Sequence, residues 1–164
     1  MKLLFDHLAF RVKDRHQAAE FFVHALHYSI VEEFDLPFPD GSKARSLALS
    51  PPKNVIAPEI FISDGEPGSI VGDWVEKNGP GLHHVAIATD HVEDQMEAWM
   101  ELELAEFTSN PLTCPDQSMT QVFTKPMSET LGVVFELIHR RDKESKGFCA
   151  ANVIKLMESS VDKS

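Results

Sequence analysis

The sequence contains no apolar run near the roughly 20 residues that a membrane-spanning helix needs, which argues against an integral membrane protein. Its first ten residues, MKLLFDHLAF, are interrupted by Asp6 and His7, and no small-residue cleavage site follows them. The start therefore does not resemble a signal peptide, and we predict a cytoplasmic protein. Low-complexity tracts are also lacking, and a composition of 43% hydrophobic and 25% charged residues is that of a globular protein.

Cysteine and positive charge are both scarce. The two cysteines, Cys114 and Cys149, lack the CxxC or CxxH spacing of a zinc site, and we expect both to be reduced. The 15 lysines and arginines are outnumbered by 26 acidic residues, for a net charge of −11. Such a charge repels a phosphate backbone and argues against a nucleic-acid partner. The expected partner is a small-molecule substrate, and a homodimer stays open.

One sequence pattern occurs twice. A strand-like segment with alternating apolar residues is followed by a segment with apolar residues at helical spacing, and then by three strand candidates separated by proline and glycine. A shift of 77 residues places His7 on His84 and Glu59 on Glu136. The pattern predicts helices at 14–27, 69–77, 92–104 and 148–158, and strands at 5–12, 28–34, 44–50, 59–63, 83–89, 105–110, 119–125 and 133–139.

This order predicts an α+β protein of two paired βαβββ modules with an added C-terminal helix. We expect one domain over residues 1–164, because the chain is too short for two ordinary domains. Module one covers residues 1–66, a linker helix 67–80, module two 81–140, and a tail helix 147–159.

The two repeated histidines are candidate metal ligands. Side chains alternate along a strand, so His7 shares a face with Ala9 and Arg11, and His84 shares one with Ala86. The alanines beside the histidines leave room for an ion and a substrate.

A carboxylate completes the candidate ligand set. Glu136 lies in an apolar strand, where a carboxylate is costly to bury unless it is paired or metal-bound. Two neutral imidazoles and one carboxylate form a triad that leaves coordination positions open and suits Fe(II), with Zn, Ni, Co or Mn also accepted. The plainer interpretation pairs Glu136 with Arg140 or Lys125 and makes each histidine structural. The repetition favours a metal site of His7, His84 and Glu136.

These segments resemble the vicinal oxygen chelate superfamily, which includes glyoxalase I, methylmalonyl-CoA epimerase, bleomycin-resistance proteins and extradiol-type dioxygenases. The resemblance rests on DH near the start, GPGLHHVAIAT at 79–89 and FELIHR at 135–140, and it covers essentially the whole chain. It implies the glyoxalase/bleomycin resistance/dioxygenase fold, with paired modules forming an open cup around the metal.

Within that superfamily, the chain is most similar to the catalytic domain of 4-hydroxyphenylpyruvate dioxygenase. The similarity is carried by GPGLHHVAIAT, TQVFTKP at 120–126, FELIHR and GFCAAN at 147–152. It implies Fe(II) bound by the histidine and glutamate triad, a substrate contact at Gln121 and ring stacking at Phe123. Ser46 matches a serine of the same pocket. A second clamping aromatic is replaced by Val153, which favours a short relative with a different substrate.

Two chemistries compete. The first is a non-haem Fe(II) dioxygenase acting on a small 2-oxo acid. The second is a divalent-metal isomerase or lyase of the methylmalonyl-CoA epimerase or glyoxalase type, in which Glu59 is a fourth ligand or the proton-transfer base. Glu59 and Phe61 share a strand face, so side-chain alternation does not decide which of them points at the metal. The depth of each residue along the strand decides between the two chemistries. A third alternative is a small-molecule binding protein without turnover.

Overall fold

The repeated sequence pattern folds into two units with the same strand connections. The computed structural model describes residues 3–130, 132–143 and 145–161. It divides into a unit of His7–His83, here the N-terminal unit, and a unit of Met1–Asp6 with His84–Ser164, here the C-terminal unit. The α+β fold of βαβββ modules with a C-terminal helix is confirmed. The predicted module boundaries and the single domain stay predictions.

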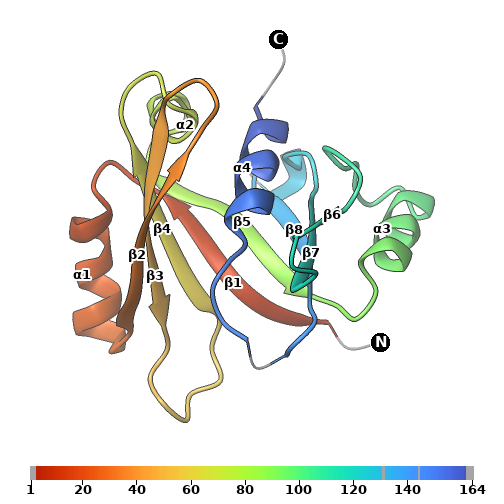
Figure 1. Cartoon of the computed structure of the whole chain (residues 1–164), viewed down its shortest axis with the longest axis horizontal. Helices are drawn as coiled ribbons and strands as arrows, with labels where there is room; N and C mark the ends of the chain where they lie inside the picture. Colours follow the sequence, from red (N-terminus) through yellow and green to blue (C-terminus); the bar gives the residue numbers. More distant parts are fainter. Residues whose placement is uncertain (1–2, 131, 144, 162–164) are drawn as a thin grey trace. The chain divides into compact units, whose positions relative to one another are not determined.

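The N-terminal unit contains a sheet in the order β2-β3-β4-β1. Strand β1 runs parallel to β4, whereas β3 is antiparallel to both of its neighbours. Helix α1 packs on β3 and β4 (Figure 1). The elements are β1 (Leu4–Arg11), α1 (Arg15–Leu26), β2 (Ser29–Pro37), β3 (Lys43–Ser50), β4 (Glu59–Gly65) and α2 (Ile70–Asn78).

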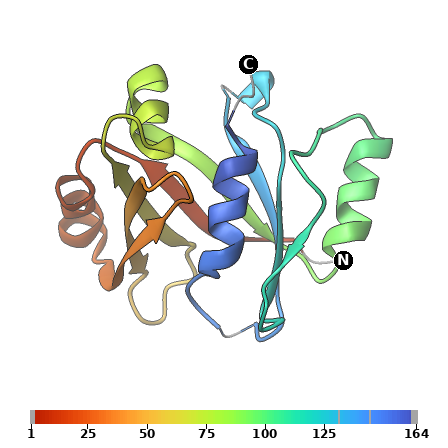
Figure 2. The same cartoon turned by 45° about the horizontal axis from the view of Figure 1, so that its top comes forward.

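The C-terminal unit repeats this topology with strands in the order β5-β8-β7-β6. Strand β5 is parallel to β8, and β7 is antiparallel to β6 and β8. Helix α4 lies along β7, as Figure 2 shows. The elements are β5 (Gly81–Ala88), α3 (Val92–Glu101), β6 (Leu112–Thr113), β7 (Met119–Phe123), a 3-10 turn η1 (Ser128–Thr130), β8 (Val134–Arg140) and α4 (Ala150–Ser159).

Alternation along the strands decides which face becomes core. In the N-terminal unit the odd face of β1 carries His7, while Leu8 and Phe10 pack with the buried strand residues Ile60 and Ile62 beneath α1. In the C-terminal unit Ile87 packs with Leu137 and with residues of α3. Burial of these apolar faces against a helix leaves the opposite face of each sheet for the residues that carry chemistry.

One predicted strand does not form. Residues 105–110 were expected to be extended, but the structure has only an isolated bridge there, between Phe107 and Thr124. The paired edge strand is instead β6, two residues long. Its proline, Pro111, directly precedes β6, where the missing backbone N–H costs no ladder hydrogen bond.

The expectation that both cysteines are reduced is wrong for this structure. Cys114 and Cys149 form a disulfide across 35 residues, with Cα atoms 6.2 Å apart. Cys149 is the N-cap residue of α4, and Cys114 directly follows β6. Packing of α4 on the β6–β7 hairpin brings the two residues together. The spacing of the cysteines in the sequence does not predict that contact.

Among the described residues, no helix combines the length and apolar character needed to cross a bilayer. The cytoplasmic location and the homodimer stay predictions.

Candidate metal centre

Two of the three predicted ligands lie together in the C-terminal unit. His84 is on β5, and Glu136 is on the adjacent strand β8, where its Cα partner is Ala86. The carboxylate is therefore one diagonal step from the imidazole on the same face of the sheet. Both residues are buried, with Glu136 only 1% exposed.

The distance between these two side chains fits a shared ion. His84 Nε2 and Glu136 Oε2 are 3.2 Å apart. Two ligand atoms that each lie about 2.1 Å from one ion, at roughly a right angle, are themselves about 3 Å apart. An imidazole nitrogen and a carboxylate oxygen are also the donor types that first-row divalent metals accept.

A chain of side-chain hydrogen bonds holds the glutamate in place. Gln121 Nε2 donates to Glu136 Oε1 over 2.7 Å, and Asn152 Nδ2 donates to Gln121 Oε1 over 3.0 Å. Asn152 also donates to the carbonyl of Leu112. The amide of Gln121 is thus engaged at both ends, and helix α4 is linked through it to Glu136.

The predicted substrate residues occupy buried places in their own units. Phe123, on β7, lies beside His84 with ring centroids 4.8 Å apart. Ser46, on β3 of the N-terminal unit, shares a 2.7 Å hydrogen bond with Ser63. The predicted substrate contacts of Gln121, Phe123 and Ser46 stay predictions.

The third predicted ligand, His7, belongs to the N-terminal unit. In that unit the ring of Phe61 occupies the place that the carboxylate of Glu136 has in the C-terminal unit. His7 is buried on β1, and Phe61 on β4 has Ala9 as its Cα partner, as Glu136 has Ala86. The rings of His7 and Phe61 are 4.8 Å apart, edge to face.

The register also corrects the equivalence inferred from the sequence. The 77-residue shift pairs Glu136 with Glu59, but Glu59 lies directly opposite His7, two residue pairs before Phe61. Phe61 follows His7 by 54 residues, whereas Glu136 follows His84 by 52, so the first repeat is two residues longer between these points.

Glu59 nevertheless is not the solvated strand-edge charge that the plainer interpretation of the sequence allowed. Its side chain is 2% exposed, and Ser50 donates to its Oε1 over 3.2 Å.

The two basic residues considered as partners of Glu136 each pair with another carboxylate. Arg140 makes a bidentate pair with Asp6, at 2.8 and 2.9 Å, and also donates to the carbonyl of Gly147. Lys125 pairs with Glu106. The contacts given for Glu136 are instead with His84 and Gln121.

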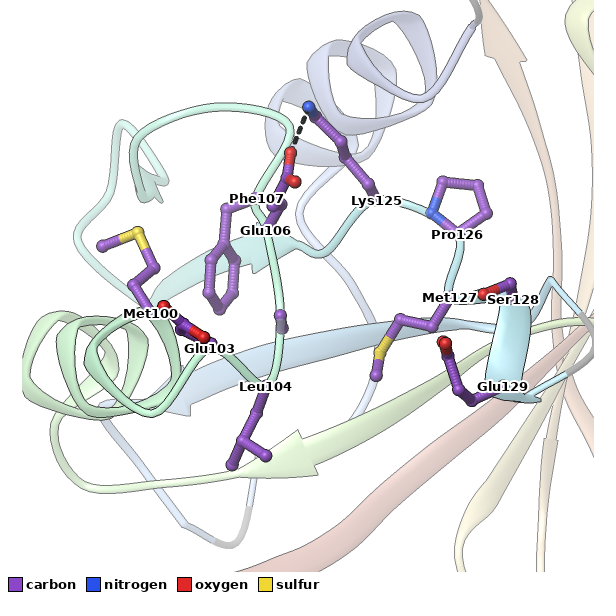
Figure 3. Close-up of a pocket in the computed structure, with 11 residues that line it drawn as sticks. Met100, Glu103, Leu104, Glu106, Phe107, Lys125, Pro126, Met127, Ser128 and Glu129 are labelled. Carbon is purple, nitrogen blue, oxygen red and sulfur yellow. Dashed lines mark hydrogen bonds and ion pairs between the residues drawn. The ribbon is translucent and has the colours of Figure 1, made fainter.

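A surface cavity of the C-terminal unit contains none of the predicted site residues. It measures about 940 Å³ and lies between the end of α3 and the turn η1. Figure 3 shows Glu106 and Lys125 paired at its rim. Its lining includes Met100, Leu104 and Glu129 but no histidine, so it does not resemble a metal centre.

A family model described as the Glyoxalase/Bleomycin resistance protein/Dioxygenase superfamily matches residues 6–111. The chain belongs to this superfamily. The match spans β1 and β5, the two strands that carry the histidines. No curated protein sequence matches the chain.

Solved structures of the glyoxalase/dioxygenase superfamily share the fold at low identity. A mutant of 4-hydroxymandelate synthase from Streptomyces coelicolor is 16% identical, with a TM-score of 0.81, over 96% of this chain and 53% of that one. Methylmalonyl-CoA epimerase from Mycobacterium tuberculosis is 20% identical, with a TM-score of 0.64, over 85% and 89%. A hypothetical protein from Bacillus halodurans is 19% identical, with a TM-score of 0.65, over 89% and 100%. The chain thus spans about half of the synthase.

The contacts of two residues near the candidate site became clear only in the structure. Asn152 emerges as the hydrogen-bond partner of Gln121, a contact between elements 31 residues apart. Arg11 proves to be fully buried, although its place on the His7 face follows from strand alternation. Parity was thus the available signal for Arg11. For Asn152 the signal was the resemblance of residues 147–152 to a dioxygenase segment, which does not specify its contact with Gln121.

Proposed function

We propose that this chain is a metal-dependent dioxygenase-like enzyme that acts on a small 2-oxo acid, similar to 4-hydroxyphenylpyruvate dioxygenase. The observation that carries the proposal is the register of β4, in which Phe61 holds the place that Glu136 holds on β8. A site with one carboxylate and two imidazoles has three protein ligands and keeps positions open for substrate and O₂.

The proposed ligands are His7, His84 and Glu136. His84 and Glu136 lie 3.2 Å apart within the C-terminal unit, and the sequence repeat that matches His7 to His84 supports His7 as the third ligand. The superfamily supports a divalent ion, and the donor set favours Fe(II), with Zn, Ni, Co or Mn as alternatives. When bound, such an ion supplies Lewis-acid and redox chemistry to a chelating 2-oxo acid.

The residues around the ligands have separable roles in this proposal. Gln121 orients the carboxylate of Glu136 by its 2.7 Å hydrogen bond, and Asn152 fixes the amide of Gln121. Phe123 presents an apolar ring beside His84, against which the substrate would pack while water is excluded.

A metal-dependent isomerase or lyase of the epimerase type is the second candidate, because Glu59 is buried on the same sheet face as His7. In that chemistry a positioned carboxylate moves a proton while charge develops on a substrate oxygen. Methylmalonyl-CoA epimerase shares the fold, but an identity of 20% does not allow the roles of its residues to be assigned to this chain.

The test loads the protein anaerobically with Fe(II) and then adds 2-oxo acids and O₂. We expect oxygen consumption that depends on a 2-oxo acid. Glu59→Gln should retain stoichiometric metal and turnover, because Glu59 lies two residue pairs away from the ligand position. His84→Ala should lose the metal, whereas the control His91→Ala, at the start of α3, should keep it.

Three results would count against the proposal. Racemisation of an acyl-CoA that is lost in Glu59→Gln, without oxygen consumption, would establish the second candidate. Retained metal in His84→Ala would show that the ligand is misplaced. Tight binding of a small molecule by a protein that loses its metal on dialysis and turns nothing over would establish a binding protein.

A further inference from the structure

Arg11 is a buried cation with no acidic partner within the described ranges of the chain. Its side chain is 3% exposed, and its Nη2 atom has no hydrogen-bond partner. Burial lowers the pKa of its guanidinium to about 9, so the group still carries its charge at neutral pH. The guanidinium carbon lies 5.5 Å from the ring centroid of Trp74, within the range of a cation–π contact.

Other arginines of the structure pair with carboxylates, whether they are buried or partly exposed. Arg15 and Arg45 both bind the carboxylate of Asp64. Arg140 binds Asp6. A buried charge without a counter-ion destabilises the folded chain, so an arginine kept in that state is a candidate for binding a ligand.

The neighbours of Arg11 across the N-terminal sheet are hydrogen-bonding groups. Ser63 on β4 is its Cα partner, and Ser46 on β3 is the partner of Ser63. The two hydroxyls share one hydrogen bond of 2.7 Å, in which either can be the donor, so one hydroxyl proton remains for another acceptor. A guanidinium and two hydroxyls thus form a row of donors on the sheet face of His7.

Apolar residues separate this row from His7. The next row toward His7 consists of Ala9, Phe61 and Ala48. Arg11 follows His7 by four residues, and a strand rises about 3.3 Å per residue, so the two Cα atoms are roughly 13 Å apart. A ligand that reaches both rows would have polar groups at its two ends and an apolar middle.

We propose that Arg11, assisted by Ser63 and Ser46, binds a carboxylate at the end of the substrate farthest from His7, with Trp74 holding the guanidinium. That the opposite end of the substrate is a 2-oxo acid at the metal rests on the proposed function. The substrate class then narrows to 2-oxo acids with a second carboxylate, about five to eight carbons long by the strand spacing. Arginine suits this role because its planar fork matches a carboxylate bidentately.

The first experiment uses the full chain without metal. Binding of hexanoate and of the uncharged hexanol is followed by ligand-observed NMR in the wild type, in Arg11→Met and in the matched control Arg45→Met. Hexanoate, but not hexanol, should bind the wild type and the control, and its affinity should fall at least tenfold in Arg11→Met. Equal hexanoate affinity in all three proteins would overturn the proposal.

The second experiment compares 2-oxoadipate with 2-oxohexanoate by anaerobic calorimetry on the Fe(II)-loaded protein. The dicarboxylate should bind the wild type at least tenfold more tightly, and Arg11→Met should abolish that preference, while Arg11→Lys keeps part of it. Equal affinities in the wild type would refute the subsite and leave the metal centre standing. Arg11-dependent hexanoate binding by a protein that takes up no metal would keep the subsite and refute the proposed function.

Thermal unfolding without ligand separates this role from a structural one. Removal of an unpaired buried charge should raise the Tm of Arg11→Met by a few degrees, because methionine keeps the apolar stem. A lowered Tm together with unchanged carboxylate binding would mark Arg11 as a packing residue held by Trp74 and overturn the proposal.

Discussion

The N-terminal and C-terminal units share strand connections but differ in the side chain one diagonal step from their histidine. In the C-terminal unit that step leads from His84 to a carboxylate, and in the N-terminal unit it leads from His7 to the ring of Phe61. A repeated backbone therefore presents equivalent positions without equivalent chemistry. At this step the C-terminal unit has a carboxylate and the N-terminal unit an apolar ring, and the buried carboxylate of Glu59 lies directly opposite His7 instead.

A second difference lies farther along the same strands. The polar row of the N-terminal unit, with Arg11 on β1, corresponds in the C-terminal unit to Ala88, Ile138 and Gln121. Ile138 packs there with the disulfide-bonded cysteines. The C-terminal unit thus has alanine and isoleucine at the two places where the N-terminal unit has Arg11 and Ser63.

The largest expected effect tests the diagonal positions. Glu136→Ala should abolish stoichiometric divalent-metal binding, because it removes the carboxylate ligand, whereas Phe61→Ala should keep stoichiometric binding. Equilibrium dialysis with metal analysis measures both. Stoichiometric metal binding by Glu136→Ala would show that the metal site does not depend on the carboxylate of the C-terminal unit.

The next effect concerns the helix-facing cores, where we expect the units to be alike. Ile62 on β4 and Leu137 on β8 each follow the diagonal position by one residue, and both are 0% exposed. Ile62→Ala and Leu137→Ala should each lower the free energy of unfolding by about 2–5 kcal/mol. Urea denaturation measures this, with the exposed Val31→Ala as a control that should change it by less than about 0.5 kcal/mol. A negligible change in the free energy of unfolding for either variant would show that the two units do not depend alike on their helix-facing cores.

A smaller effect tests the hydrogen-bond chain that only the C-terminal unit has. Asn152→Leu removes the donor that fixes Gln121, and we expect metal affinity to fall about 10- to 100-fold. Ser159→Ala, also on α4, loses the contact with Thr108 and should leave metal affinity unchanged. Competition with a metal chelator gives both affinities. Equal affinity in the two variants would limit α4 to a packing role.

The smallest effect concerns how the equivalent helices begin. Asp14 accepts hydrogen bonds from the backbone N–H groups of His16 and Gln17, and the bond from Gln17 is the main cause of a lowered pKa for its carboxyl group. His91 makes no such side-chain bond at the start of α3. Asp14→Ala should lower the Tm slightly, and His91→Asp should raise it.

The pH dependence of that effect follows from the direction of the shift. A lowered folded-state pKa stabilises the protein above the unfolded value of about 3.9, and this stabilisation is lost as the pH falls through the folded pKa. The Tm difference between wild type and Asp14→Ala should therefore be full near neutral pH and shrink below about pH 4. A difference that persists at pH 2 would contradict the capping role.

Local patterns were sufficient for most elements. Helices α1 and α2 begin where Asp14 and Ser69 cap them, and the strands with clear alternation form within a few residues of their predicted bounds. The segment 105–110 failed because short extended segments pair only when a neighbouring strand offers a matching edge. The edge of β7 pairs instead with the two-residue strand β6.

The sequence by itself determined the repeated βαβββ order, the face that each histidine occupies and the residue types of the candidate site. These follow from side-chain periodicity, which acts over a few residues. Only the tertiary structure decided that Phe61 rather than Glu59 matches Glu136, that the two cysteines meet, and that Arg11 is buried with no counter-ion among the residues described. Periodicity assigns a face but not a depth, and contacts between distant segments depend on the register in which whole strands pair.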